Sequence, residues 1–130
     1  MSAAARPLIL IVDDIGDNRQ MYAEYLEYDG YRVEQAGSGA EAVVFAEEVN
    51  PALIVMDLSM PDMDGWEAIR RIRSNARTTS IPILVVSGYA FDATQRGQED
   101  ARADAFLRKP CLPEDLAAAI AAMLARRERG

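Results

Sequence analysis

Five side chains that could bind a ligand or react stand at the ends of short apolar runs of the sequence. Asp13 and Asp14 follow the first run, Asp57 follows the third, Ser87 follows the fourth and Lys109 follows the fifth. Such runs predict strands, and in an open parallel sheet ligands bind beyond the carboxyl ends of the strands. We therefore expect three carboxylates, a hydroxyl and an ammonium group to converge at one edge.

The three carboxylates predict a site for a divalent cation. Two like charges 4 Å apart repel by about 4 kcal/mol at an effective dielectric constant of 20. Either a pKa rises or a cation neutralises the cluster. The chain has no His and only one Cys, so oxygen ligands favour Mg²⁺, with Mn²⁺ as a second candidate. In the alternative interpretation, Asp13 or Asp14 only caps a loop or a helix.

The apolar runs also predict the fold. Three of them are unbroken, as in strands covered on both faces, whereas 31–35 alternates and 105–108 is weakly aliphatic. We place these two at the edges, and right-handed crossovers then favour the order 2-1-3-4-5. The fold class is α/β, a doubly wound, flavodoxin-like sheet of five parallel strands. The predicted strands are 8–12, 31–35, 53–56, 83–86 and 105–108.

Five helices are expected between and after these strands. The first ends at Gly30, the second opens with the capping-box spacing of Ser38 and Glu41, and the last begins at Pro113. The helix over 92–101 has the weakest pattern, because a glycine interrupts it and its apolar stripe is thin. The other helices are expected near 17–29, 38–50, 64–75 and from 113 onward.

Length and charge indicate one domain over 1–130, with a core of about 7–125. The net charge of −7 opposes binding to nucleic acid or to an anionic membrane. The N-terminal apolar run is too short for a signal peptide, and the Ala-rich stretch 116–125 is about half a membrane span. The lone Cys111 is expected to be a small hydrophobic residue in a reducing, cytoplasmic compartment.

A carboxylate in this setting can act as a nucleophile and form an aspartyl phosphate. Such chemistry needs in-line placement and neutralisation of the negative charge on the phosphoryl oxygens. Mg²⁺ could take one oxygen, Lys109 a second and the Ser87 hydroxyl a third. Taken singly, Lys109 would be a solvated surface charge and Ser87 a turn residue, so the prediction depends on their joint placement.

Four motifs together resemble the receiver domains of bacterial two-component signalling. They are Asp13-Asp14, the segment 57–65 (Asp-Leu-Ser-Met-Pro-Asp-Met-Asp-Gly), Ser87-Gly88 and Lys109-Pro110. Each motif alone is moderately specific, whereas their order and spacing are highly specific. The resemblance spans about 7–124, nearly the whole chain.

The resemblance implies a role for each matched position. Asp57 would accept the phosphoryl group, and Lys109 would bind it. Asp13, Asp14, the Asp57 carboxylate and the Ser59 backbone carbonyl would coordinate Mg²⁺. The Lys109-Pro110 peptide bond would be cis, a form found in only about 5–6% of X–Pro bonds in folded proteins.

Ser87 and Phe106 match the family's switch pair, in which the hydroxyl moves toward the phosphate and the ring turns inward. Output would then pass through the fourth helix, the fifth strand and the fifth helix. Packing in the core is the other interpretation of Phe106. Arg102 stands where the family usually has a glycine, which puts that output face in question. Ser59 and Tyr89 match positions that vary within the family, and the resemblance implies that they would affect how long the phosphate survives.

Three functions compete. The first is a stand-alone receiver that takes phosphate from a histidine kinase or a phosphotransfer protein, since the chain has no His of its own. It would act on a downstream protein or pass the phosphate on. The second is a phosphate-insensitive scaffold, or a receiver excised from a hybrid kinase. The third, an enzyme acting on phosphorylated small molecules, is disfavoured because Ser59 stands where a general acid is needed.

The first helix carries Tyr22, Tyr25 and Tyr28 at three-residue spacing. A packed or half-exposed aromatic stripe is the ordinary interpretation. The alternative is a docking surface for a kinase or a phosphotransfer helix. Trp66 has no role that the sequence assigns.

Overall fold

The computed structural model describes residues 6–58, 65–87 and 103–129, with the side chains of 87 and 127–129 left out. The strands are β1 (Leu8–Val12), β2 (Arg32–Ala36), β3 (Leu53–Asp57), β4 (Ile83–Ser87) and β5 (Ala105–Arg108). The described helices are α1 (Gly16–Tyr28), α2 (Gly39–Val49), α3 (Gly65–Ser74) and α5 (Pro113–Arg129). The helix expected over 92–101, like Arg102, lies outside the described residues.

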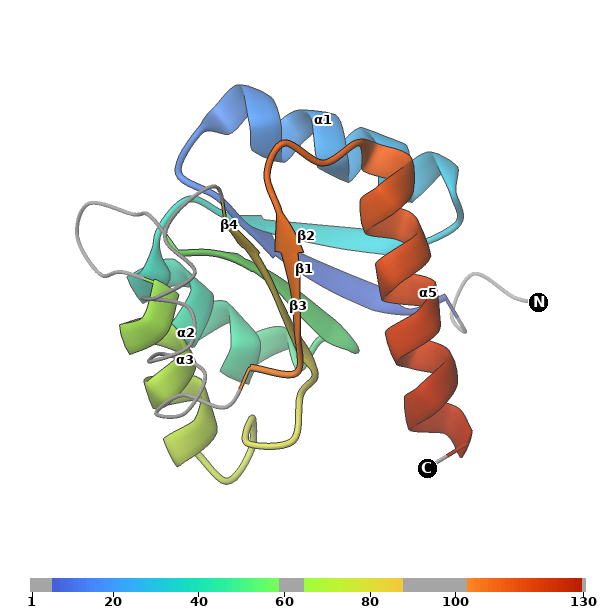
Figure 1. Cartoon of the computed structure of the whole chain (residues 1–130). Coiled ribbons are helices and arrows are strands. Elements are labelled where there is room, and N and C mark those ends of the chain that lie inside the picture. The colour runs from blue at the N-terminus through green and yellow to red at the C-terminus, as the bar shows by residue number, and fades with distance from the viewer. Residues whose placement is uncertain (1–5, 59–64, 88–102, 130) are drawn as a thin grey trace.

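The five strands form one parallel sheet in the order β2-β1-β3-β4-β5, which confirms the predicted topology (Figure 1). The alternating strand β2 and the weakly aliphatic strand β5 are the two edges, as expected. All five residues of β3 are buried, because this strand has a strand on each side and helices on both faces. The strand bounds differ from the predicted ones by one residue at most, at β2, β3 and β4.

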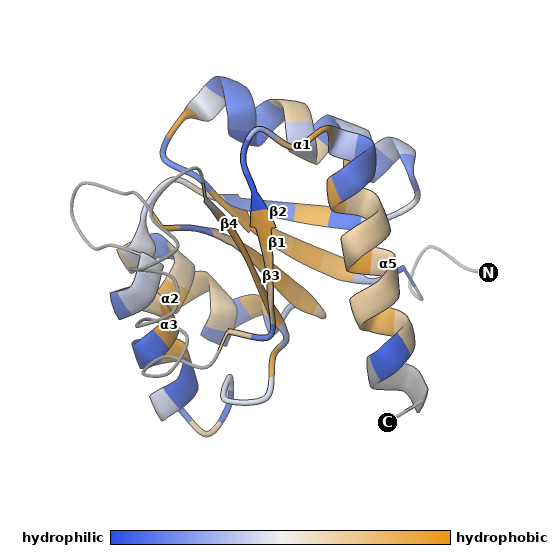
Figure 2. Cartoon of the chain, viewed as in Figure 1, coloured by the Kyte–Doolittle hydropathy of each residue, from blue (hydrophilic) through white to orange (hydrophobic). Residues whose placement is uncertain are grey.

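Helices cover both faces of the sheet, with α1 and α5 on one face and α2 and α3 on the other (Figure 1). Each face has its own cluster of buried apolar side chains. Successive residues of β1 alternate between the clusters, with Leu10 in one and Ile9 and Ile11 in the other. Figure 2 shows the resulting apolar strands at the centre of the molecule. This doubly covered core explains why the central strands are unbroken apolar runs.

Local sequence fixes several helix ends. The Ser38 hydroxyl accepts a hydrogen bond from the Glu41 amide at 3.1 Å and caps α2, as predicted. The Glu41 carboxylate accepts from the Gly37 amide at 2.7 Å, one residue before the position that a capping box would use. Gly30 has a φ of 104°, the left-handed conformation expected of a glycine after a helix. Asn50 ends α2 in the same way, with a φ of 44°.

In the described part of the chain, no helix has both the length and the apolar character needed to cross a membrane.

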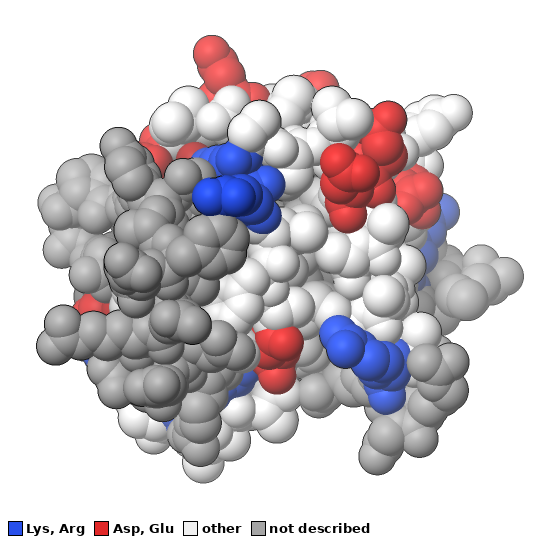
Figure 3. Space-filling model, in the orientation of Figure 1, with Lys and Arg blue, Asp and Glu red and all other residues white. Residues whose placement is uncertain are grey.

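Helix α5 begins at Pro113 with Glu114 and Asp115 in its first turn, as expected of residues beside a positive helix end. Figure 3 shows acidic side chains gathered where α5 begins.

Candidate functional site

The register of the sheet brings the first and third apolar runs side by side. Val12 of β1 is paired with Met56 of β3, so the residues that follow them, Asp13 and Asp57, lie side by side at the carboxyl ends of these strands. The amide of Asp13 extends the ladder by one bond to the Ala36 carbonyl, at 3.1 Å. The end of the sheet at which the parallel strands finish, called the carboxyl edge below, therefore carries an acidic cluster, as the sequence predicted.

The cluster consists of Asp13, Asp14 and Asp57, with one carboxylate oxygen of each within 4.8 Å of the others. The side chains of Asp13 and Asp57 are only 5% and 8% exposed, whereas Asp14 is exposed. Three close carboxylates, two of them withdrawn from water, form a hard anionic donor set. This set fits a divalent cation such as Mg²⁺, which prefers oxygen ligands.

Lys109 provides the positive charge of the site. Its ammonium Nζ lies 3.6 Å from Asp13 Oδ2 and 3.6 Å from Asp57 Oδ2, and its side chain is 24% exposed. Both distances exceed those of charge-assisted hydrogen bonds, about 2.7–2.9 Å. The Lys109 ammonium thus lies near two buried carboxylates without a short hydrogen bond to either. The Lys109-Pro110 peptide bond is cis, which confirms the expectation from the resemblance.

Hydrogen bonds hold Asp13 from several directions. Its Oδ1 accepts from the Ile15 amide at 2.9 Å, and its backbone carbonyl accepts from Arg19 Nη1 at 2.7 Å. With Oδ1 engaged by the loop, Oδ2 is the oxygen directed at Lys109. Arg19 had no role in the sequence interpretation, because nothing local marks an arginine that bonds a main-chain carbonyl.

A second unpredicted contact joins α1 to the chain after Lys109. The hydroxyl of Tyr22 donates to the Cys111 carbonyl at 3.0 Å and lies 3.7 Å from the Cys111 sulfur. Burial raises the pKa of Tyr22 well above its ordinary value of 10.0, and the bond to Cys111 and the charge of Asp13 act in the same direction. Cys111 is half-buried against the core, as expected of a small hydrophobic residue.

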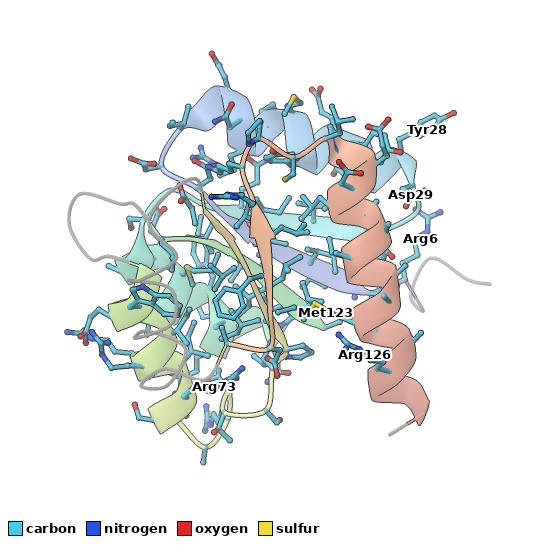
Figure 4. All side chains as sticks on the ribbon, in the orientation of Figure 1. Arg6, Tyr28, Asp29, Arg73, Met123 and Arg126 are labelled. Atoms are coloured by element: carbon cyan, nitrogen blue, oxygen red, sulfur yellow. The ribbon has the colours of Figure 1, made fainter. Side chains whose placement is uncertain are left out.

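The tyrosine stripe of α1 grades from buried to exposed. Tyr22 is buried, Tyr25 is half-buried and Tyr28 is 91% exposed, pointing away from the molecule (Figure 4). The stripe is therefore mainly packing, in line with the ordinary interpretation. An open pocket of about 400 Å³ lies between α1 and the chain after β5, lined by Asn18, Met21, Tyr22, Lys109, Pro110 and Cys111.

The predicted switch pair is only partly described. Phe106 packs against the core cluster beneath α2 and α3, and its ring centroid lies 6.2 Å from that of Trp66 at an interplanar angle of 52°. The main chain of Ser87 is paired with Arg108, next to Lys109. The side chain of Ser87 lies outside the description, as do Ser59 and Tyr89. The ring of Trp66 thus has a partner that sequence spacing could not reveal.

Gly65 at the start of α3 lies directly against the end of β3. A Cβ atom at this position would lie 2.5 Å from the Asp57 carbonyl oxygen and 2.7 Å from the Leu58 Cα. The Gly65 amide donates to the Leu58 carbonyl at 2.9 Å. The motif that contains Gly65 was recognised in the sequence, and the close approach of two backbones explains why it contains a glycine.

The response regulator receiver domain family matches residues 9–121 of the chain. The DNA-binding dual master transcriptional regulator RpaA of Synechocystis sp. is 34% identical over 123 residues, which cover 95% of this chain and 51% of RpaA. The chain thus spans about half the length of the curated relatives it matches. Since this relative is described as DNA-binding, the expectation that nucleic acid is excluded as a partner is not supported.

Solved structures give the same likeness. A CheY-like receiver domain protein from Methanospirillum hungatei superposes with a TM-score of 0.89 at 30% identity, covering 96% of this chain and 98% of that one. The receiver domain of the sensor histidine kinase PA1611 from Pseudomonas aeruginosa, described with a magnesium ion in its active site cleft, has a TM-score of 0.85 at 28% identity. It covers 93% of this chain and 99% of that one.

Proposed function

The chain belongs to the response regulator receiver domain family, and from this premise we propose that Asp57 is its phosphoacceptor. Receiver domains are signalling modules of two-component systems rather than metabolic enzymes. The observation that carries the proposal is the placement of Asp57, a buried carboxylate at the end of the central strand β3, 3.6 Å from Lys109 and beside Asp13.

The Asp57 carboxylate is the nucleophile of the proposed reaction. One of its oxygens attacks the phosphorus atom of a phosphohistidine in a kinase or phosphotransfer protein. The phosphorus–nitrogen bond breaks, the electron pair stays on the imidazole nitrogen, and an aspartyl phosphate forms. The chain has no His, so it requires an external donor of this kind or a small acyl phosphate.

Lys109 would bind an oxygen of the incoming phosphoryl group. Its ammonium lies between two carboxylates at a distance that leaves it able to take a third anionic partner. A fixed cation that stabilises charge developing in the transition state acts without reorganisation. The Ser87 hydroxyl is proposed for a further oxygen on the basis of the family resemblance.

Mg²⁺ would be held by Asp13, Asp14 and Asp57, with the Ser59 carbonyl as a further ligand by resemblance. The support on this chain is the convergence of the three carboxylates within 4.8 Å. When bound, the ion would neutralise phosphoryl oxygens and offset the repulsion between the acids. Mn²⁺ has the same ligand preference and would substitute for it.

Residues 1–130 are proposed to form one receiver domain that acts by protein contact or by passing phosphate along a relay. Phe106 and Ser87 would be its switch, and the face formed by β5 and α5 would be part of the output surface. Phe106 supports this through its partly buried position against the core and its ring contact with Trp66. Amide hydrogen exchange with and without beryllofluoride and Mg²⁺ should change at β5 and α5. An unchanged exchange pattern would favour the phosphate-insensitive scaffold.

The test of the phosphoacceptor is labelling with acetyl phosphate and Mg²⁺, followed by intact mass spectrometry. We expect the wild-type chain to gain one phosphoryl group and Asp57→Asn to gain none. Asp29→Asn, an exposed acid at the end of α1, is the matched control and should label like wild type (Figure 4). Equal labelling of Asp57→Asn and wild type would refute the proposal.

A second candidate is a receiver unit within a longer protein. Two observations favour it: the curated relatives are about twice as long as the chain, and a similar structure is the receiver domain of a sensor histidine kinase. An immunoblot of the native source cells would separate the two. A band near the mass of 130 residues supports the stand-alone module, and a much larger band supports the hybrid protein.

A further inference from the structure

We propose that Arg19 is a positioning residue for the metal site, acting through the peptide group between Asp13 and Asp14. The inference rests on the proposed function, because it concerns the same three carboxylates. It adds a residue from outside the acidic cluster that decides where two of the ligands lie. The carrying observation is the hydrogen bond from Arg19 Nη1 to the Asp13 carbonyl, at 2.7 Å.

The guanidinium of Arg19 is held in a fixed place. Its Nε donates to Gln35 Oε1 of β2 at 3.1 Å, while Nη1 donates to Asp13. It also lies against Gly37, where an added Cβ would come within 3.4 Å of Nη1. Gln35 is itself bonded to Gln20 of α1 at 3.2 Å. The planar fork of an arginine can span two acceptors in this way, whereas the single ammonium of a lysine cannot hold the same geometry.

The bond acts on Asp14 because a peptide group is planar. The Asp13 carbonyl, the Asp14 amide and both Cα atoms share one plane, so fixing the carbonyl direction fixes the direction in which the chain continues to Asp14. Asp13 has further restraints at its amide and at its Oδ1. The side chain of Asp14 is exposed, so packing does little to place it. Its position depends chiefly on the backbone that Arg19 holds.

Charge and geometry predict opposite effects when Arg19 is removed. A positive charge near the acidic cluster disfavours a cation, so a purely electrostatic Arg19 would make Arg19→Ala bind Mg²⁺ more tightly. A positioning Arg19 makes Arg19→Ala bind it more weakly. Loss of a group that orients metal ligands typically lowers affinity 10–100-fold. The direction of the change therefore separates the two roles.

The experiment is isothermal titration of the full chain with Mg²⁺ alone, at a temperature where every variant is folded. We expect about a tenfold loss of affinity for Arg19→Ala. Arg19→Lys should fall between wild type and Arg19→Ala, and Gln35→Ala should lose less than Arg19→Ala. The matched control is Arg32→Ala, which removes the same charge from an exposed site at the other end of the sheet. It should bind like wild type.

A second readout separates positioning from damage to the fold. The acetyl phosphate labelling rate of Arg19→Ala should need more Mg²⁺ for half of its maximum and approach the wild-type rate at saturating Mg²⁺. Unchanged or tighter Mg²⁺ binding by Arg19→Ala, with normal binding by wild type, would overturn the inference and leave Asp57 as phosphoacceptor. Lack of Mg²⁺ binding by wild type would instead remove the metal site, and the proposed function with it.

Discussion

The two ends of the sheet both carry buried charge, but they use it in opposite ways. At the carboxyl edge, Lys109 stands 3.6 Å from each of two buried carboxylates. At the opposite end, where the strands begin and which we call the amino edge, Arg73 of α3 forms an ion pair of 2.7 Å with Asp104, just before β5. Figure 4 shows Arg73 at the lower end of α3. The first arrangement is loose and acid-rich, and the second is tight and balanced.

Hydrogen bonds complete the amino edge. Arg73 Nη1 donates to the carbonyls of Thr79 and Ile81 at 2.9 and 2.7 Å, and Asp104 Oδ2 accepts from the Ile83 amide at 2.7 Å. The side chain of Arg73 is only 9% exposed. Paired, hydrogen-bonded charges of this kind join α3 to the beginnings of β4 and β5. The comparison indicates that charge held at close range serves the fold, and charge held apart is available for a ligand.

Removal of Arg73 should give the largest effect on stability. Arg73→Ala removes the donor to two carbonyls and leaves Asp104 with its bond from the Ile83 amide alone, so we expect a loss of about 3 kcal/mol in the free energy of unfolding. Urea denaturation measures it. Arg70→Ala, which breaks only an exposed pair with Glu67, is the control and should lose less than about 1 kcal/mol. If Arg73→Ala lost as much Mg²⁺ affinity as Arg19→Ala, the distinction between the two edges would not hold.

Loss of Lys109 should reduce phosphorylation rather than folding. We expect Lys109→Gln to label about 10²-fold more slowly with acetyl phosphate, because a charge-stabilising donor is lost from the site. Mg²⁺ binding should persist or strengthen, since one positive charge is removed from beside Asp13 and Asp57. Quench-flow or timed mass spectrometry gives the rate. Arg126→Gln, at an exposed position of α5, should label at the wild-type rate, and slow labelling by both variants would argue against a specific role (Figure 4).

A methyl group at Gly65 should disturb both the fold and the site. Gly65→Ala places a Cβ atom 2.5 Å from the Asp57 carbonyl oxygen, so β3 or α3 must shift, with an expected loss of about 2 kcal/mol. Labelling should also slow, because Asp57 moves with its backbone. Thermal unfolding and the labelling assay measure the two effects. Gly16→Ala, whose Cβ atom would lie 3.8 Å from the nearest atom, should change neither the stability nor the labelling rate.

The bond between Tyr22 and Cys111 should contribute about 1 kcal/mol of stability. Tyr22→Phe removes it, and Tyr28→Phe at an exposed position is the control. The raised pKa of Tyr22 means that the unfolded chain releases this proton first as the pH rises. Stability should therefore fall above about pH 10 in wild type, and fall less in Tyr22→Phe. If the free energy of unfolding fell equally in wild type and Tyr22→Phe between pH 9 and 11, this role would be contradicted.

The smallest effect is expected at Glu67, whose carboxylate bonds Arg70 and Arg71 at 3.0 Å on the surface of α3. The bond to Arg70, followed by that to Arg71, lowers the pKa of Glu67. Glu67→Gln should be slightly less stable than wild type at neutral pH. The difference should vanish as the pH falls from the ordinary value of 4.5 through the lower pKa of the folded chain. A difference that persists in acid would require another cause.

Much of the fold could be predicted because local pattern reports burial. The unbroken run of β3 belongs to a strand covered on both faces, and the alternation near β2 belongs to an edge. Capping by Ser38 and the turn at Gly30 depend on neighbouring residues, so they were also within reach. The candidate site followed from strand order, because parallel strands deliver their last residues to the same edge.

The long-range contacts that hold the site and the fold were out of reach for a physical reason. Tyr22 and Cys111 are 89 residues apart, and Arg73 and Asp104 are 31 apart. Whether such pairs meet depends on how the helices rotate and cross over the sheet, which spacing does not specify. Arg19 differs again, since it lies six residues from its acceptor but bonds a carbonyl that every residue possesses.

The sequence by itself predicted which residues form the candidate site and determined in what order the strands lie. Side-chain type and local periodicity are properties of a chain before it folds. Only the tertiary structure decided the spacing that leaves Lys109 between two acids, the ring contact of Trp66 with Phe106, and the hold of Arg19 on Asp13. These depend on packing between distant segments, where shifts of an ångström separate a closed ion pair from an open site.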